Sequence, residues 1–245
     1  MDEAASASAA PRASLDQLAL LPAAALTLPD LLTRVAEYAV AAIPGAEGAG
    51  VTLMETGQPD VLAASAEFVA EVDAIQYGLG EGPCISAARE RCTIRSGSLD
   101  ETARWPTFSP RVVDLGVHSV LSLPLIVDEQ TVGAINVYAH APDAFSDLAQ
   151  ALGEQFARLA AVAAHNALVV HRTMHVAEQL QRALSERAVI DQAIGVLIAA
   201  RGIDVDRARL ALDAVSQSQG APVAARVVAD ALAGTQGRSA RSDTD

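Results

Sequence analysis

The chain of 245 residues contains no lysine, so all 17 of its cationic side chains are arginines. These arginines face 30 acidic residues, which gives a formal net charge of −13 at pH 7. A negative balance of this size argues against indiscriminate binding of nucleic acid by the whole protein, because phosphate groups repel it. The alanine-rich, lysine-free composition is typical of coding in a GC-rich genome.

Cysteine and long apolar runs are also scarce. Cys84 and Cys92 are the only cysteines, which excludes a disulfide framework and indicates a reducing compartment. The N-terminus, Met1-Asp2-Glu3, carries two acidic residues and lacks the basic and apolar regions of a signal peptide. The longest apolar stretches, 18–28 and 159–170, are interrupted and fall short of the roughly 20 residues that span a bilayer. We therefore expect a cytoplasmic protein with no membrane partner.

Aromatic residues make up 3% of the chain, but 51% of it is hydrophobic, which is enough for a sizeable core. The segment 27–43 has the apolar spacing of an amphipathic helix, with Thr27 in a capping position. From residue 49 the period changes to two, which predicts strands. We expect strands at 49–54, 61–65, 120–127 and 131–138, and helical pieces at 67–75, 84–90 and 106–115. This pattern predicts an α+β fold with an antiparallel sheet.

A long helix is expected to begin near Ser146. Two interleaved series of seven-residue repeats run through it from 152 to 184, and Phe156 belongs to the second series. One interpretation is a parallel coiled-coil dimer with Asn166 fixing its register, and the other is a single helix packed on the sheet. The seam residues of the dimer interpretation are Leu159, Asn166, Val170, Leu180 and Leu184.

Three short helical patterns follow the seam. The first ends at Gly202, the second starts at the N-cap Asp204, and the third opens at Pro222. The predicted division is a disordered lead (1–14), a sheet domain (15–150), a coiled-coil helix (151–184), a three-helix bundle (180–235) and a disordered tail (236–245).

The charge is divided unevenly between the two ends. Residues 1–175 hold nine arginines against 21 acidic residues, a net of −12, whereas 176–245 hold eight against nine, a net of −1. This distribution suits a protein that touches a polyanion only through its C-terminal end.

Four motifs in the first part resemble a bacterial GAF sensor domain. They occupy 76–84, 104–108, 116–125 and 133–138, in the order expected for that family. The resemblance implies an antiparallel sheet, flanking helices that often dimerise, and a small-molecule pocket on one sheet face. The candidate pocket residues are Tyr77, Glu81, Cys84, Arg104, Trp105 and His118.

Each candidate also has a plainer interpretation. The glycine-rich run at 78–82 is either a pocket wall or a tight loop. In one interpretation Cys84 is a functional thiol: a reactive group with a lowered pKa, a redox switch with Cys92 or the attachment point of a bilin. In the other it is a small buried residue. The pair Arg104-Trp105 either binds a planar or anionic ligand or plugs the edge of the core.

The histidines do not predict a metal site. His118 is a metal or haem ligand in one interpretation and a hydrogen-bonded polar residue in the other. His171 and His175 are four residues apart on a helix, but no third ligand is evident nearby, so no metal is predicted. The sequence identifies no cofactor.

The C-terminal part resembles an ANTAR domain, most strongly at Ile190–Leu197 and again at Asp206–Leu212. That family is a three-helix RNA-binding module of transcription antitermination regulators. Arginine suits such contacts because its planar guanidinium group donates hydrogen bonds to two phosphate oxygens at once and stacks on unpaired bases. The plainer interpretation is an intrahelical ion pair, such as Arg187 with Asp191. The candidate RNA-binding residues are Arg182, Arg187, Gln192, Arg201, Arg207, Arg209 and Arg226.

Together the two resemblances imply a GAF–ANTAR antitermination regulator of actinobacterial type. Such a protein is not an enzyme; it is a homodimer that binds RNA stem-loops in nascent transcripts in response to an unknown small-molecule signal. Two alternatives stay open at this point: a sensor whose helical end binds DNA or a partner protein, and a GAF-type redox enzyme.

Overall fold

The computed structural model describes residues 14, 17, 18, 26–55, 58–101 and 103–219. The chain divides into two compact units, Met1–Arg172 and Thr173–Asp245, and each is described by itself. The predicted lead (1–14, apart from Ser14), the third C-terminal helix and the tail lie outside the described residues. Within the described ranges, no helix has both the length and the apolar character needed to cross a membrane.

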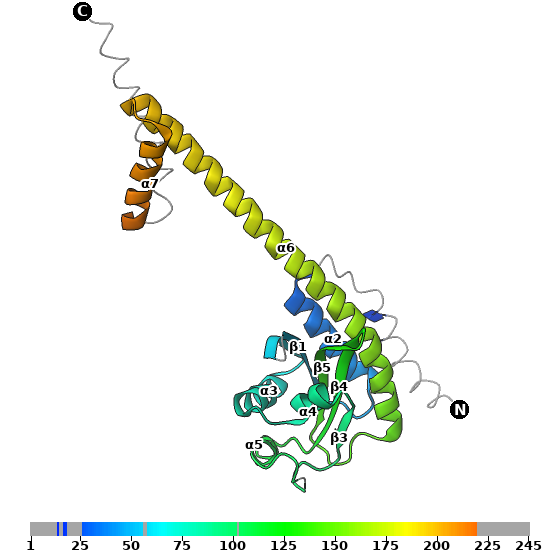
Figure 1. Cartoon of the computed structure of the whole chain (residues 1–245). Coiled ribbons are helices and arrows are strands. Elements are labelled where there is room, and N and C mark those ends of the chain that lie inside the picture. Colours follow the sequence, from blue (N-terminus) through cyan, green and yellow to red (C-terminus); the bar gives the residue numbers. More distant parts are fainter. Residues whose placement is uncertain (1–13, 15–16, 19–25, 56–57, 102, 220–245) are drawn as a thin grey trace, which may run out of the picture. The chain divides into compact units, whose positions relative to one another are not determined.

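The first unit contains an antiparallel sheet, as the sequence predicted, but with five strands where the sequence predicted four. Its spatial order is β2-β1-β5-β4-β3 (Figure 1). The strands are β1 (Gly48–Glu55), β2 (Gln58–Ala64), β3 (Ile94–Ser96), β4 (Ser119–Val127) and β5 (Gln130–Ala139). The edge strand β3 was not predicted, because three residues are too few to establish an alternating pattern.

The helices begin and end close to the predicted positions. Thr27 caps the first of them, since its hydroxyl accepts a hydrogen bond from the Asp30 amide at 3.3 Å. The helices are α2 (Leu28–Ala42), α3 (Glu67–Leu79), α4 (Pro83–Glu90), α5 (Phe108–Val113), α6 (Asp147–Arg201) and α7 (Val205–Gln219).

The sheet has helices on both faces, because its side chains alternate between the two sides. On one face, α2 and the first part of α6 pack against residues such as Val51, Leu123 and Ile135 to form the larger core. On the other face, α3, α4 and α5 cover a smaller core that contains Val120 and Tyr138 (Figure 1). The candidate pocket residues belong to this second face or its margin.

Helix α6 presents two apolar faces in the first unit. Alanines and Phe156 pack into the larger core, and Phe156 is 0% exposed. The placement of Phe156 on the seam is therefore wrong, because its spacing also fits a helix face packed on the sheet. The seam residues Leu159, Asn166 and Val170 are exposed on the opposite face. Leu180 and Leu184, on the part of α6 that belongs to the second unit, are exposed as well.

In the second unit, α6 ends before Gly202, whose φ of +63° stops the helix. Asp204 then caps α7 by accepting a hydrogen bond from the Arg207 amide at 2.8 Å, as predicted. Among the residues of this unit whose burial is described, the buried ones are Ala193, Ile194, Leu197, Ala208 and Leu212.

Two large apolar residues of this unit, Ile190 and Leu210, lie outside this core. Ile190 is 42% exposed and Leu210 is 67% exposed. Ala208 and Leu212 are four residues apart and share one helix face, so Leu210 between them points to the other side.

Candidate functional site

A cluster of buried polar side chains lies between α3 and the sheet. Its centre is Asp73, which is 3% exposed. Its carboxylate oxygen Oδ1 accepts a hydrogen bond from the Tyr138 hydroxyl at 2.7 Å and another from the Asn136 amide at 3.2 Å. Asn136 in turn accepts a hydrogen bond from Ser122 at 2.8 Å. The cluster therefore connects α3 with β4 and β5.

The local sequence explains why Asp73 is inside. Val69, Val72, Asp73 and Gln76 occupy one stripe of α3 at spacings of three and four, so the two polar residues face the sheet with the two valines. Gly50 on β1 gives Asp73 its room, because a Cβ there would lie 2.2 Å from the Asp73 oxygen Oδ2.

Burial sets the protonation behaviour of the cluster. It raises the pKa of Asp73 to about 6, although the hydrogen bonds from Tyr138 and Asn136 act in the opposite direction. Burial likewise raises the pKa of Tyr138 and of Tyr77 well above the ordinary range for tyrosine. The carboxyl of Asp73 is thus the group of this cluster that changes charge near neutral pH.

Two of the predicted pocket residues meet beside Asp73. The Tyr77 hydroxyl lies 3.0 Å from the Cys84 sulfur, and Cys84 is fully buried. Burial raises the pKa of the Cys84 thiol to about 12, so the thiol is protonated at neutral pH. A protonated, buried thiol is a poor nucleophile, which favours the interpretation of Cys84 as a small buried residue.

The glycine-rich run forms the turn between α3 and α4. Gly82 has a φ of +153°, and a Cβ there would lie 2.3 Å from the Gln76 oxygen. The missing side chain lets Gln76 reach across and accept a hydrogen bond from the Cys84 amide at 2.9 Å. The run therefore serves as a tight loop that holds the start of α4 against α3.

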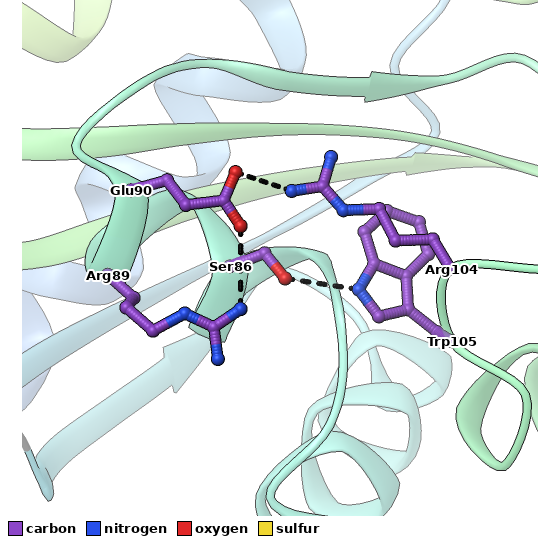
Figure 2. Close-up of polar contacts among 5 residues, drawn as sticks. All are labelled: Ser86, Arg89, Glu90, Arg104 and Trp105. Atoms are coloured by element: carbon purple, nitrogen blue, oxygen red, sulfur yellow. Dashed lines mark hydrogen bonds and ion pairs between the residues drawn. The ribbon is translucent and has the colours of Figure 1, made fainter.

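Arg104 and Trp105 contact residues of α4 (Figure 2). Trp105 is buried, and its indole N–H donates to the Ser86 hydroxyl at 3.1 Å. Arg104 pairs with Glu90 at 2.5 Å and lies over the Trp105 ring, 5.3 Å from its centroid. The hydrogen bond from Arg104 lowers the pKa of Glu90. These contacts favour the plug interpretation for Trp105.

The remaining two predicted pocket residues make contacts elsewhere. Glu81 accepts hydrogen bonds from the amides of Thr107 and Phe108 at 2.7 and 2.9 Å, next to the start of α5, and the Phe108 bond lowers its pKa. His118 pairs with Asp100 at 2.8 Å. The six predicted residues thus do not form one group; only Tyr77 and Cys84 lie in the buried cluster.

Most of the cluster was not predicted from the sequence. Asp73, Gln76 and Asn136 interrupt otherwise apolar segments, and polar residues at predicted core positions were the available signal. No local pattern indicates that α3 and β5 face one another. Within the described residues, no group of three His, Cys, Asp or Glu side chains forms a potential metal site.

The candidate RNA-binding residues of the second unit lie on its surface. Arg182, Arg187, Gln192, Arg201, Arg207 and Arg209 are all exposed, and Arg226 lies outside the described residues. Arg207 lies 3.8 Å from Asp204, whereas Arg187 and Asp191, both described, form no ion pair with each other. Arg187 and Arg201 are fourteen residues apart, close to four full turns, so they share one side of α6.

Comparison with known proteins agrees with both resemblances. The family model of the GAF domain matches residues 25–165, and that of the ANTAR domain matches residues 178–232. No curated protein sequence matches the chain.

Solved structures share the fold of the first unit at low identity. The GAF domain of a phosphoenolpyruvate-protein phosphotransferase from Coxiella burnetii is 17% identical, with a TM-score of 0.52, over 66% of this chain and 95% of that one. A free methionine-R-sulfoxide reductase from Neisseria meningitidis is 15% identical, with a TM-score of 0.50, over 71% and 95%. The chain therefore belongs to the GAF domain family and carries an ANTAR domain after its GAF domain, the architecture of antitermination regulators.

Proposed function

We propose that the protein is a signal-responsive, RNA-binding antitermination regulator that acts as a homodimer in the cytoplasm. The observation that carries the proposal is the order of its parts: a GAF domain, a continuous helix from Asp147 to Arg201, and an ANTAR domain. This function needs no catalytic residue. The signal must bind one arrangement of the dimer more tightly than another, because only differential affinity shifts an equilibrium.

The exposed face of α6 supports the homodimer. Large apolar side chains recur along it at heptad-like spacings, among them Leu159, Val162, Leu180 and Leu184. The exposed Asn166 lies in the same stripe, where an amide pairs with its twin across a two-stranded coil and fixes the register. A second copy of the same stripe is the occupant we propose.

The arginines of the second unit support contact with RNA. Exposed guanidinium groups pair bidentately with phosphate oxygens and stack on the unpaired bases of loops. Since this end of the chain is near neutral and the other end strongly acidic, binding is expected to be confined to the ANTAR domain. In a homodimer, two such surfaces engage two stem-loops of one transcript.

A competition assay tests this function. The full chain is bound to a labelled RNA with two tandem hairpins and challenged with unlabelled hairpin RNA or duplex DNA. We expect hairpin RNA to compete and the affinity to fall as salt rises, because phosphate contacts release counterions. Equal competition by duplex DNA would favour the DNA-binding alternative. Absence of salt-sensitive RNA affinity, with and without cell extract, would contradict the proposal.

A further inference from the structure

Helix α6 packs on the GAF core through one defined face. The residues that form this face are buried and recur every three or four positions: Phe156, Ala157, Ala160, Ala161, Ala164, Ala167 and Leu168. At 3.6 residues per turn, their mean direction lies close to that of Ala164. The fold of the first unit therefore determines which side of α6 points away from the domain, independently of any repeat in the sequence.

Large apolar side chains occupy the side that points away. In the first unit, the exposed residues there are spaced by three and four positions: Leu159, Val162, Asn166 and Val169. The part of α6 in the second unit continues this spacing with further exposed residues: Thr173, Val176 and Leu180. The alternation of three and four is a heptad frame, and its direction lies roughly 180° from the buried face.

A second heptad frame competes with the first. It shares half of these residues but continues through Ala163 and Val170 in place of Val162 and Val169. Its direction is turned by roughly 50° toward Phe156. Ala163 packs partly against the GAF core, and Val170 is 37% exposed, compared with 49% for Val169. The second frame therefore turns toward the domain's own core, and the first is the one that a partner helix can cover.

The charge along α6 makes this face suitable for a second copy of the chain. With 30 acidic residues and a net charge of −13, two copies repel each other over most of their surface. Between positions 155 and 185, however, Glu178 is the only acidic residue. It follows Ala164 by fourteen residues, close to four full turns, so it lies on the side of α6 opposite the apolar face. That face thus lacks the negative charge that keeps two copies apart.

The flanks of the apolar face favour one orientation of the two copies. One flank carries Arg158 and Arg172, and the other carries Ala163 and Val170. In a parallel coil, each flank lies beside the opposite flank of the partner, so the arginines meet uncharged side chains. In an antiparallel coil, the arginine flanks of the two copies would lie beside each other. The parallel arrangement also lets the two Asn166 amides pair.

From this geometry we propose that a second copy of the chain docks in parallel on α6, along a seam made of Leu159, Val162, Asn166, Val169, Thr173, Val176 and Leu180. Val170 and Leu184, which the sequence placed in the seam, then lie on its flank. The inference rests on the homodimer of the proposed function and specifies which side of α6 the partner covers and in which direction the partner runs.

Cysteine cross-linking distinguishes the two frames at neighbouring residues of the same type. Val169→Cys and Val170→Cys are made in the full chain together with Cys92→Ser, because Cys92 is exposed whereas Cys84 is buried. Under mild oxidation we expect Val169→Cys to form a disulfide-linked dimer at least tenfold faster than Val170→Cys, since seam positions of a parallel coil approach their own copies most closely. An equal or higher rate for Val170→Cys, or slow cross-linking of both, would overturn the inference.

Alanine variants measure the same difference without a new thiol. Val169→Ala should weaken self-association at least fivefold, as measured by light scattering over a concentration series, and Val170→Ala should weaken it less than twofold. Both side chains are exposed, so urea unfolding should give both variants the stability of the wild-type GAF domain. Equal weakening by both variants, or a wild-type mass of more than two chains, would overturn the inference.

The failure of this inference is distinguishable from that of the proposed function. The mass of the wild type and its binding of the tandem hairpin are measured on the same preparation. A chain that dimerises and binds this RNA but cross-links faster at position 170 refutes only the seam. A chain that is monomeric at every concentration refutes the homodimer and the seam together.

Discussion

At the scale of single residues, Asp73 determines part of the dependence of stability on pH. Its pKa is about 6 in the folded state and near the ordinary value of 3.8 when unfolded. The folded state therefore holds this proton more tightly, and the free energy of unfolding falls as pH rises from about 4 to about 6. We expect Asp73→Asn to lack this fall, which amounts to roughly 3 kcal/mol at about 1.4 kcal/mol per pKa unit.

Urea unfolding at several pH values between 4 and 7 measures the effect as the difference between wild type and Asp73→Asn. Glu47, Glu81 and Glu90 have lowered pKa values and contribute the opposite slope, but they are present in both proteins and cancel. Asp128→Asn, which removes an exposed carboxylate from the β4–β5 turn, is the matched control. Parallel pH profiles for wild type and Asp73→Asn would contradict the prediction.

The two cysteines should differ sharply in reactivity. Cys92 is exposed, whereas Cys84 is buried and has a pKa of about 12. Since the thiolate is the reactive form, iodoacetamide should label Cys92 of the folded chain and leave Cys84 unmodified until urea is added. Mass spectrometry of the digested protein locates the label. Equal labelling of both thiols in the folded state would revive the reactive interpretation of Cys84.

At the scale of elements, the two faces of α6 predict opposite results for neighbouring positions. Phe156 lies in the core and Leu159, less than one turn away, is 43% exposed. Phe156→Ala should lower the free energy of unfolding by about 3–5 kcal/mol, because it leaves a cavity in the GAF domain. Leu159→Ala should leave the fold of that domain intact and weaken self-association.

Urea unfolding and light scattering on both variants separate these outcomes. Each variant is the control for the other, since both truncate a large apolar side chain of the same helix. A large loss of GAF stability in Leu159→Ala, or an unchanged dimer mass at every concentration, would count against Leu159 as a seam residue.

Asn166 is expected to fix the register of the coiled coil at a cost in its stability. In a two-stranded coil, a buried amide fixes the register at a cost in stability, so Asn166→Leu should raise the melting temperature yet alter the oligomeric state or register. Light scattering reports the mass, and disulfide trapping of cysteines introduced along α6 reports the register. A variant with unchanged mass, register and response to signal would remove the basis of the coiled coil.

The elements themselves were largely predictable from the sequence. The period of two in β1, β4 and β5 and the cap at Thr27 depend on local pattern, and both are found in the structure. The strand β3 escaped prediction because its pairing with β4, and not its three residues, makes it a strand. The seven-residue spacing wrongly placed Phe156 on the dimer seam, because spacing alone does not show which of the two faces of a helix meets the sheet.

At the scale of the whole molecule, charge is expected to confine RNA binding to one end. Arg187→Gln combined with Arg201→Gln removes two exposed cations from the same side of α6. The double variant should reduce the magnitude of the salt-dependence slope of RNA binding by about 0.7 for each phosphate that these arginines neutralise. Arg111→Gln, an exposed arginine on α5 of the GAF domain, is the matched control. Filter binding across a salt series measures both variants, and equal slopes for all three proteins would contradict the assignment.

The sequence by itself determined the antiparallel sheet, the long helix, the cap at Asp204 and the order of a GAF and an ANTAR domain. Each of these depends on residues close together in the chain, in patterns that neighbouring residues reveal. Tertiary structure alone decided that Asp73, Asn136 and Tyr138 meet in one buried cluster, while Glu81, Arg104 and His118 contact other groups. The physical reason is that sheet register and helix packing join residues more than sixty positions apart, and no local pattern encodes which of them meet.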